Sequence, residues 1–306
     1  MHFIGVFNQD GGMLRTMDLG AFADRARAIM GEHGHTLEAR IVRGTNLRSE
    51  LVRAATDSSA QALLVGGGDG TISAAADVCF QTGMPLAVVP AGTMNLFARA
   101  LKIPLNPEEA VKALAVGSTV GVDIATANGR PFVHQYSVGI HTRLVRIRES
   151  IMYNSRWGKI LASLRAFRLA VSRPPRFLAE IRTPRGSEIR EASGITVSNN
   201  LLGEGHIPHA DAIDRGVLGV YVIEPMSALK LAKLSLRVVL GTWKAHPMVS
   251  EKEVTFVSLR FRKRKPSDQA LIDGELIALE PQVDIQIHPG ALNVIAPLVQ
   301  PAVVAA

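Results

Sequence analysis

The stretch VGGGDGT, from Val65 to Thr71, combines glycines that suit phosphate with an aspartate that phosphate repels. Glycine has no Cβ atom, so the backbone can approach a phosphate chain, and a helix N-terminus adds unpaired N–H groups. Asp69 is understandable if its partner is a hydroxyl or a Mg²⁺ ion that bridges protein and phosphate oxygens. The stretch therefore predicts an anion-binding loop that also handles a cation.

Two common phosphate-binding motifs do not account for this loop. The P-loop needs a Gly-Lys-Ser/Thr sequence, and the first lysine of the chain is Lys102. The dinucleotide-binding fingerprint needs a third glycine where Thr71 stands. The loop therefore belongs to a different class of phosphate site.

The elements around the loop alternate between apolar β-type runs and helical patterns. The first half of the chain offers strand candidates at residues 3–7, 37–42, 62–65 and 85–89, and helix candidates at 19–30, 47–55 and 72–80. Such alternation predicts a mostly parallel sheet with helices on both faces, whose ligands bind at the carboxyl ends of the strands. The glycine loop follows one of those ends.

Length and composition indicate an ordinary globular chain. With 306 residues, about two domains are expected, and 47% hydrophobic residues suffice for sizeable cores. A single cysteine, Cys79, excludes an internal disulfide framework and favours a reducing compartment, so we expect a cytoplasmic protein. No signal peptide is expected at the N-terminus, and polar residues and prolines interrupt the apolar residues 291–306 too often for a membrane span.

Positive charge is concentrated in the second half of the chain. Residues 1–127 hold 10 Lys and Arg against 12 Asp and Glu, and the remainder holds 24 against 15. Residues 155–172 and 227–240 combine helical apolar stripes with basic residues, which are either a solvated face or a face that docks on anionic lipid. Nucleic acid is not an expected partner, because the chain has 15 aromatic residues and no recognised nucleic-acid motif.

Several motifs together resemble the diacylglycerol kinase catalytic-domain family, in particular its soluble bacterial lipid kinases, and more distantly NAD kinases and 6-phosphofructokinases. The glycine loop is similar to the family's GGDGT loop. The other matching stretches are FNQDGG at residues 7–12, Thr45, PAGTMNLFAR at 90–99, VDI at 122–124 with NG at 128–129, IDGE at 272–275, and residues 289–297.

The resemblance implies a fold of class α/β plus β. Residues 1–127 would form a three-layer α/β nucleotide-binding domain to which residues 291–306 return, and residues 128–290 would form an antiparallel β-sandwich for the lipid substrate. The second half supports this independently with short strand candidates at residues 177–183, 194–198, 217–223, 254–260 and 283–287.

The resemblance also assigns roles to residues. ATP would be bound by Asn8, Gly11, Gly12, Arg15, Thr45, Gly67, Gly68, Asp69, Gly70, Thr71, Thr93 and Asn95. Mg²⁺ would be held by Asp69 and Asp123. Glu275 would accept the proton of the attacking hydroxyl, with Asp273 as a second catalytic carboxylate. On an extended segment both carboxylates would point to one side, whereas Asp-Gly is also a common hairpin turn.

Two residues depart from the family pattern. Leu96 stands where many relatives have an acidic residue after the asparagine of the second motif. Arg215 stands where some bacterial relatives have an aspartate, so a structural Mg²⁺ described for that loop is not expected here unless Asp211 or Asp214 compensates. Histidines such as His134, His141, His206 and His209 lack metal-ligand spacing, and surface or core positions are expected for them.

The combined prediction is an ATP- and Mg²⁺-dependent transfer of phosphate to the hydroxyl of diacylglycerol or a related lipid alcohol, in phospholipid biosynthesis. The protein would be cytoplasmic and bound peripherally to anionic membranes. Two alternatives remain: an NAD kinase-like enzyme with a soluble acceptor, and a nucleotide-binding regulator at the membrane. The sequence leaves open whether the chain forms a homodimer.

Overall fold

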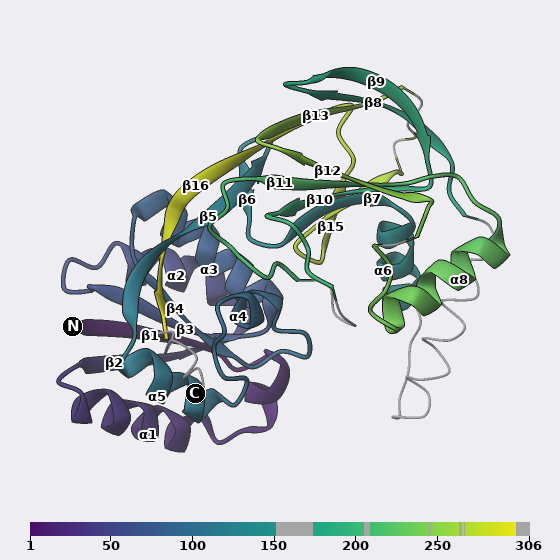
Figure 1. Cartoon of the computed structure of the whole chain (residues 1–306). Coiled ribbons are helices and arrows are strands. Elements are labelled where there is room, and N and C mark those ends of the chain that lie inside the picture. The colour runs from purple at the N-terminus through teal and green to yellow at the C-terminus, as the bar shows by residue number, and fades with distance from the viewer. Residues whose placement is uncertain (151–173, 205–208, 245, 263–264, 266, 298–306) are drawn as a thin grey trace, which may run out of the picture. The chain divides into compact units, whose positions relative to one another are not determined.

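The computed structural model describes residues 1–150, 174–204, 209–244, 246–262, 265 and 267–297. The chain divides into two compact units (Figure 1): one holds Met1–Ile124 and the chain from Pro289 onward, and the other holds Ala125–His288. The chain passes between the units within two strands, β5 (Ser118–Ala127) and β16 (Gln282–Ala296).

The first unit contains a parallel sheet whose central strands are buried on both faces. Its strand order is β2-β1-β3-β4-β16. The bounds are β1 His2–Asn8, β2 Thr36–Val42, β3 Ala62–Gly67 and β4 Leu86–Pro90. All residues of β3 and β4 are buried, which is why their sequences are near-continuous apolar runs rather than alternating ones.

Helices cover both faces of this sheet (Figure 1). The helix α1 (Leu19–Glu32) packs on β2 and on α5 (Pro107–Ala115), and α2 (Leu47–Ala55) packs on β1 and on α3 (Asp69–Thr82). The buried Leu19, Phe22, Ala26 and Met30 recur at helical spacing along α1. The predicted three-layer α/β arrangement is confirmed. The short helices η1 (Gly12–Thr16), η2 (Gly44–Asn46) and α4 (Leu96–Ala100) follow β1, β2 and β4.

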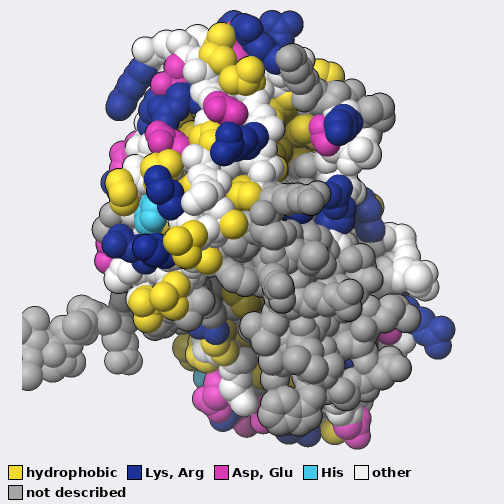
Figure 2. Space-filling model, turned by 90° about the vertical axis from the view of Figure 1, so that its right-hand side faces the viewer, with side chains coloured by type: hydrophobic (Ala, Val, Ile, Leu, Met, Phe, Trp, Pro, Cys, Tyr) yellow, Lys and Arg dark blue, Asp and Glu magenta, His cyan; other side chains and the backbone are white. Residues whose placement is uncertain are grey.

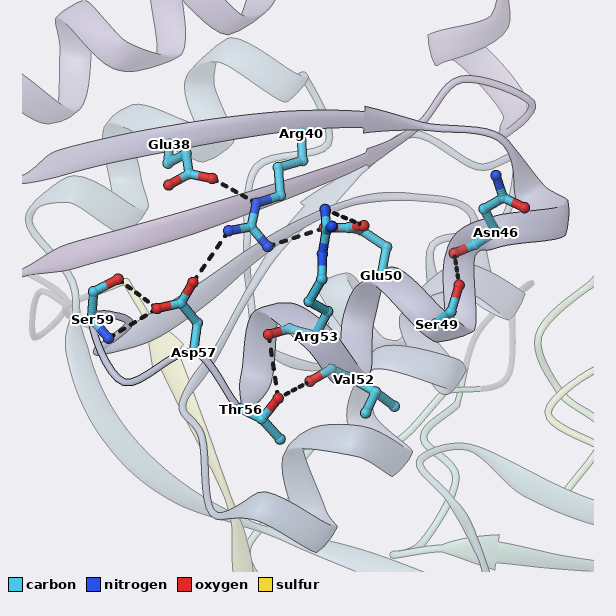
Figure 3. Close-up of polar contacts among 10 residues, drawn as sticks. All are labelled: Glu38, Arg40, Asn46, Ser49, Glu50, Val52, Arg53, Thr56, Asp57 and Ser59. Atoms are coloured by element: carbon cyan, nitrogen blue, oxygen red, sulfur yellow. Dashed lines mark hydrogen bonds and ion pairs between the residues drawn. The ribbon is translucent and has the colours of Figure 1, made fainter.

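A largely buried arginine ties β2 to α2 (Figure 3). Arg40 of β2 contacts Glu38 at 2.7 Å, Glu50 of α2 at 3.0 Å and Asp57 at 3.3 Å. Burial opposes the charge on Arg40, yet its hydrogen bonds to these carboxylates raise its pKa above the ordinary value. The network fixes both elements that flank η2, the turn that carries Thr45.

The second unit is an antiparallel β-sandwich, as predicted. One sheet has the order β12-β11-β10-β7-β14-β15, and the other brings together β16, β13, β8 and β9. Along β16, Val283, Ile285 and Ile287 alternate with exposed residues and point into the core between the sheets. The remaining bounds are β6 Arg130–Phe132, β7 Gln135–Gly139, β8 Phe177–Thr183, β9 Gly186–Ala192, β10 Gly194–Asn199, β11 Leu218–Ile223, β12 Val249–Val254, β13 Phe256–Phe261, β14 Gln269–Ile272 and β15 Glu275–Ala278.

Two helices of the second unit pack against a smaller apolar cluster. The helix α8 (Ala228–Val239) buries Leu231 and Leu234 beside Trp243, and α6 (Ile140–Ser150) contributes Ile140. The amphipathic stretch predicted at residues 227–240 is thus a helix, while the stretch at 155–172 lies outside the described residues. Within the described ranges, none of the helices has the length and apolar content of a transmembrane span.

Candidate active site

Three loops meet in direct backbone contact at the carboxyl ends of β1, β3 and β4. The amide of Met13 donates to the carbonyl oxygen of Ala91 at 2.7 Å. A Cβ atom on Gly12, whose φ is +45°, would lie 2.0 Å from that same oxygen. A Cβ atom on Gly92 would lie 2.8 Å from the Cα of Gly68. Glycine is therefore required at these two positions by the contact between the loops themselves.

Asp69 joins the first glycine loop to the second. Its carboxylate accepts the amide of Asn95 at 3.0 Å and the amide of Leu96 at 2.6 Å. The backbone of Asn95 is left-handed, with φ of +52°, and its side chain bonds both the N–H and the C=O of Gly92. Asp69 and Asn95, both predicted to serve the nucleotide, thus also build the loops. Leu96 contributes its backbone amide to this arrangement.

Asn8 joins β1 to the start of α3. Its Nδ2 donates to the hydroxyl of Thr71 at 2.9 Å, and its Oδ1 accepts the amide of Asp10 at 3.1 Å. A Cβ atom on Gly67 would lie 2.5 Å from the Thr71 side chain, so this glycine makes room for Thr71. A Cβ atom on Gly11 would lie 3.5 Å from the Cα of Gly67. The packing of these residues fixes the direction in which α3 begins.

The N-terminus of α3 offers the features of an anion site. No side chain caps it at Gly68, and the space beside Gly70 is open. The first amides of a helix have no partner within the helix and attract negative charge. Thr93 and Arg15 are exposed on the adjoining loops, and Arg15 forms no ion pair with the part of the chain that the structure describes. These residues fit a phosphate chain.

Thr45 lies on η2, at the carboxyl end of the neighbouring strand β2. The turn is tied to the β1 loop, because the amide of Gly44 donates to Asp10 Oδ2 at 2.8 Å. Thr45 itself is exposed, and its hydroxyl contacts Asn46 at 3.4 Å. The four predicted nucleotide-binding segments therefore all belong to the same edge of one sheet.

The two predicted Mg²⁺ ligands have different surroundings. Asp123 is 1% exposed, and its Oδ1 accepts the amide of Gly290 at 2.9 Å, which joins β5 to β16. Asp69 lies on the glycine loop, where lone pairs remain on its oxygens beyond the two amide contacts. The described residues contain no cluster of three or more metal-ligating side chains. One loop carboxylate still fits Mg²⁺, which proteins commonly bind through one or two carboxylates together with substrate phosphates.

In the second unit, Asp273 and Gly274 form the turn between β14 and β15. Their φ values are +45° and +91°, as an Asp-Gly hairpin turn requires. The premise that Asp273 and Glu275 share an extended segment was therefore wrong, because both turn residues adopt a left-handed backbone. The Asp273 carboxylate accepts three backbone amides, from Val133 at 2.9 Å, His134 at 2.9 Å and Gln135 at 3.0 Å.

Glu275 begins β15 and is exposed. Its carboxylate forms an ion pair with Arg130 at 2.7 Å. Asp273 thus anchors the turn to the segment before β7, whereas the Glu275 carboxylate faces outward. Arg130 carries no sequence signal of this role, because it lies 145 residues from Glu275 and is marked only by the Asn-Gly pair that precedes it at 128–129.

The histidines near this turn are neutral. Burial lowers the pKa of His134 to about 3 and that of His141 to about 4. Gln135 Nε2 donates to His141 Nδ1 at 2.9 Å, which connects the Asp273 anchor to the first turn of α6. At Arg215, the second departure from the family pattern, the side chain pairs with Glu253 at 3.7 Å.

Comparison with known proteins agrees with both units. Residues 3–127 match the diacylglycerol kinase catalytic domain, and residues 163–296 match the YegS C-terminal NAD kinase beta sandwich-like domain. An uncharacterised protein of Synechocystis is 27% identical over 77% of this chain and 55% of its own length. A protein of Serratia proteamaculans named "Probable lipid kinase YegS-like" is 35% identical over 37% of this chain and 39% of its own length. The matched part is thus about half or less of these curated relatives.

Solved structures share the fold over nearly the whole chain. A crystal structure of a diacylglycerol kinase from Bacillus anthracis has a TM-score of 0.72 and 18% identity, covering 99% of this chain and 98% of the other. A second chain from that organism has a TM-score of 0.76 and 21% identity over the same shares. The two family matches thus show that the chain contains a diacylglycerol kinase catalytic domain followed by a YegS-type β-sandwich domain.

Proposed function

We propose that this chain is a lipid kinase that transfers the γ-phosphate of ATP, with Mg²⁺, to the hydroxyl of diacylglycerol or a related lipid alcohol. The observation that carries the proposal is the junction of glycine loops, in which Asp69 accepts the amides of Asn95 and Leu96 beside the uncapped N-terminus of α3. The family of the chain supports a kinase on a lipid-like acceptor.

The first unit would bind ATP at the edge of its parallel sheet. The amides of Gly68 to Thr71 would receive phosphate oxygens, because the first turn of α3 lacks partners of its own. Arg15 and Thr93 would add a guanidinium and a hydroxyl from the neighbouring loops, and Thr45 would contact the nucleotide from η2. Mg²⁺ held by Asp69, with Asp123 as the predicted second carboxylate, would neutralise charge on the phosphate oxygens.

The second unit would supply the base. A lipid hydroxyl has a pKa far above neutrality, so its proton must leave as its oxygen bonds to the γ-phosphorus. Glu275 would accept this proton while the bond between the γ-phosphorus and the oxygen of ADP breaks. The Arg130 ion pair would orient the Glu275 carboxylate, and the three amides on Asp273 would hold the turn beneath it.

Contact with anionic membranes would occur through the outer face of α8. Leu229, Leu236 and Leu240 are 68%, 58% and 59% exposed, and they lie along one side of the helix at spacings of seven and four residues. Lys230, Lys233 and Arg237 are exposed beside them. On the upper part of the face in Figure 2, Lys and Arg side chains lie among hydrophobic and acidic ones. Such a mixture of leucine and cation is typical of helices that lie in a lipid interface.

The test is an acceptor screen with the purified chain. We expect ATP consumption with Mg²⁺ to rise strongly with a diacylglycerol or another lipid alcohol, and to stay at background with NAD or without acceptor. Phosphorylation of NAD alone would replace the proposal by a soluble-acceptor kinase. If the chain binds nucleotide but turns over none of the acceptors, only the alternative of a nucleotide-binding regulator at the membrane would remain.

A further inference from the structure

The second unit contains a cavity that the proposed reaction does not use. It measures about 330 Å³, at the lower end of the range for small-molecule sites. Its basic lining comes from three places in the sequence. Arg143 and Arg146 lie one turn apart on α6, Arg176 immediately precedes β8, and Lys265 follows β13.

The cavity lining carries an excess of positive charge. Its one acidic residue, Asp268, accepts the backbone amide of Lys265 at 2.7 Å through Oδ2. Among the described residues no carboxylate pairs with Arg146 or Arg176. Six other cations of this unit do form ion pairs: Arg130, Arg182, Arg190, Arg215, Lys244 and Lys252. Of the cavity cations, Arg146 and Arg176 therefore have no carboxylate partner within the described ranges and can receive an anion from outside the chain.

Apolar side chains line the same cavity. Phe177 and Phe261 pack with their ring centroids 6.0 Å apart, and Val138 and Leu279 also contribute. Leu178, also in the lining, is 42% exposed. A small inorganic ion gains no binding free energy from apolar walls, whereas an amphiphile contacts both the cations and the apolar surface.

The cavity is separated from the Asp-Gly-Glu turn by the length of β14. Gln269, at the start of the strand, lines the cavity, and Ile272, at its end, leads into Asp273. A span of four residues on a strand is about 13 Å. A group bound at the cations therefore does not touch the Glu275 carboxylate at the same time.

We infer that this cavity binds the phosphate-bearing headgroup of an anionic glycerophospholipid, as a site separate from that of the acceptor hydroxyl. Arg146 and Arg176 present planar guanidinium groups that match phosphate oxygens two at a time, which lysine cannot do. The apolar walls take the first part of the acyl chains. The inference concerns binding alone, so it stands apart from the proposed transfer reaction.

The test measures binding to the full chain by calorimetry, with four soluble probes in separate titrations. These are dihexanoylphosphatidylglycerol below its micellar concentration, dihexanoylphosphatidylcholine, glycerol 3-phosphate and inorganic phosphate. We expect the first probe to bind about tenfold or more tightly than each of the others, because only it combines net negative charge with acyl chains. Inorganic phosphate binding as tightly as the lipid would overturn the lipid assignment, and so would a lack of binding by the first probe.

Three double variants localise the site. Arg146→Gln with Arg176→Gln should weaken binding of the anionic lipid about tenfold or more. Arg182→Gln with Arg185→Gln removes the same charge at the other end of β8 and should leave the affinity unchanged. Arg146→Lys with Arg176→Lys keeps the positive charge but loses the planar guanidinium groups. This variant should bind the anionic lipid more tightly than the glutamine variant but less tightly than the wild type. Equal affinity of the first variant and the wild type, with both chains folded by thermal melting, would contradict the inference.

Discussion

The carboxylate of Asp69 accepts the backbone amide of Leu96 at 2.6 Å, across 27 residues of sequence. With the bond to the amide of Asn95, this contact makes the two glycine motifs one structural piece. A substitution at Asp69 is therefore expected to act on the loops as well as on any bound cation.

For Asp69→Asn we expect loss of most turnover. The amide keeps one acceptor oxygen but turns an NH₂ group toward a backbone N–H, which costs about 1–3 kcal/mol of unfolding free energy. It also removes the charge proposed to act through Mg²⁺. Kinetics over a Mg²⁺ titration and denaturant unfolding check the two effects separately. Thr93→Ala, which removes one exposed hydroxyl, should have the smaller effect on turnover. Near-normal activity of Asp69→Asn at saturating Mg²⁺ would refute the assignment.

Glu275→Gln should lower kcat by roughly 10²–10⁴ with little change in ATP affinity, because the amide keeps the shape and cannot accept a proton. Arg130→Gln is the matched control, since it removes the ion pair but leaves the carboxylate, and its loss of kcat should be much smaller. Similar losses in both variants would mean that the pair acts as a structural contact.

Asp273→Asn should act mainly on stability. The native carboxylate accepts three amides, and an amide side chain opposes one of them with its own N–H groups. We expect a loss of about 1–3 kcal/mol in unfolding free energy, with a moderate decrease in kcat. If Asp273→Asn abolishes most of kcat at unchanged stability while Glu275→Gln lowers kcat only slightly, the catalytic roles of the two residues must be exchanged.

Protonation of His141 should contribute to the pH dependence of the unfolding free energy. Burial lowers its pKa from 6.5 to about 4, so between these values the unfolded chain binds a proton that the folded chain does not. The unfolding free energy should therefore fall as the pH decreases from 6.5 to about 4, by roughly 1–3 kcal/mol for this group. His134 acts in the same direction. His141→Gln should flatten the slope in chemical denaturation, and His33→Gln, at an exposed position, should not. An unchanged slope in His141→Gln would contradict the assignment.

Charge reversal on α8 should abolish docking on anionic vesicles. Lys230, Lys233 and Arg237 each contribute about 1 kcal/mol at an anionic surface, and glutamates there are repelled. Sedimentation with phosphatidylglycerol vesicles should fall in the triple glutamate variant, and should also fall with salt in the wild type. Activity on a short-chain soluble acceptor should persist. Binding that survives high salt but is lost in Leu229→Asn with Leu236→Asn would assign docking to the leucines instead.

Local patterns predicted most of the elements. The helix expected at residues 47–55 and the strand expected at 177–183 match α2 and β8, because apolar spacing and turn residues specify such elements locally. The sandwich was predicted less completely. The expected strand at 254–260 proved to be the end of β12 followed by β13, and β7, β9, β14 and β15 were not predicted. Of these, β7, β14 and β15 have only four or five residues, and β7 pairs with strands far along the chain.

The sequence alone determined the family, the fold class and the position of the glycine loops at strand ends, since these depend on residue types at short spacing. Only the tertiary structure decided what the key side chains contact. Asp69 holds a loop 27 residues away, and Asp273 turns into the segment at 133–135 about the left-handed backbone of its hairpin, leaving Glu275 exposed. The cluster of Arg143, Arg146, Arg176 and Lys265 likewise exists only in three dimensions. The physical reason is that a hydrogen bond or ion pair requires atoms within about 3–4 Å, and for residues distant in sequence only the packed fold sets that distance.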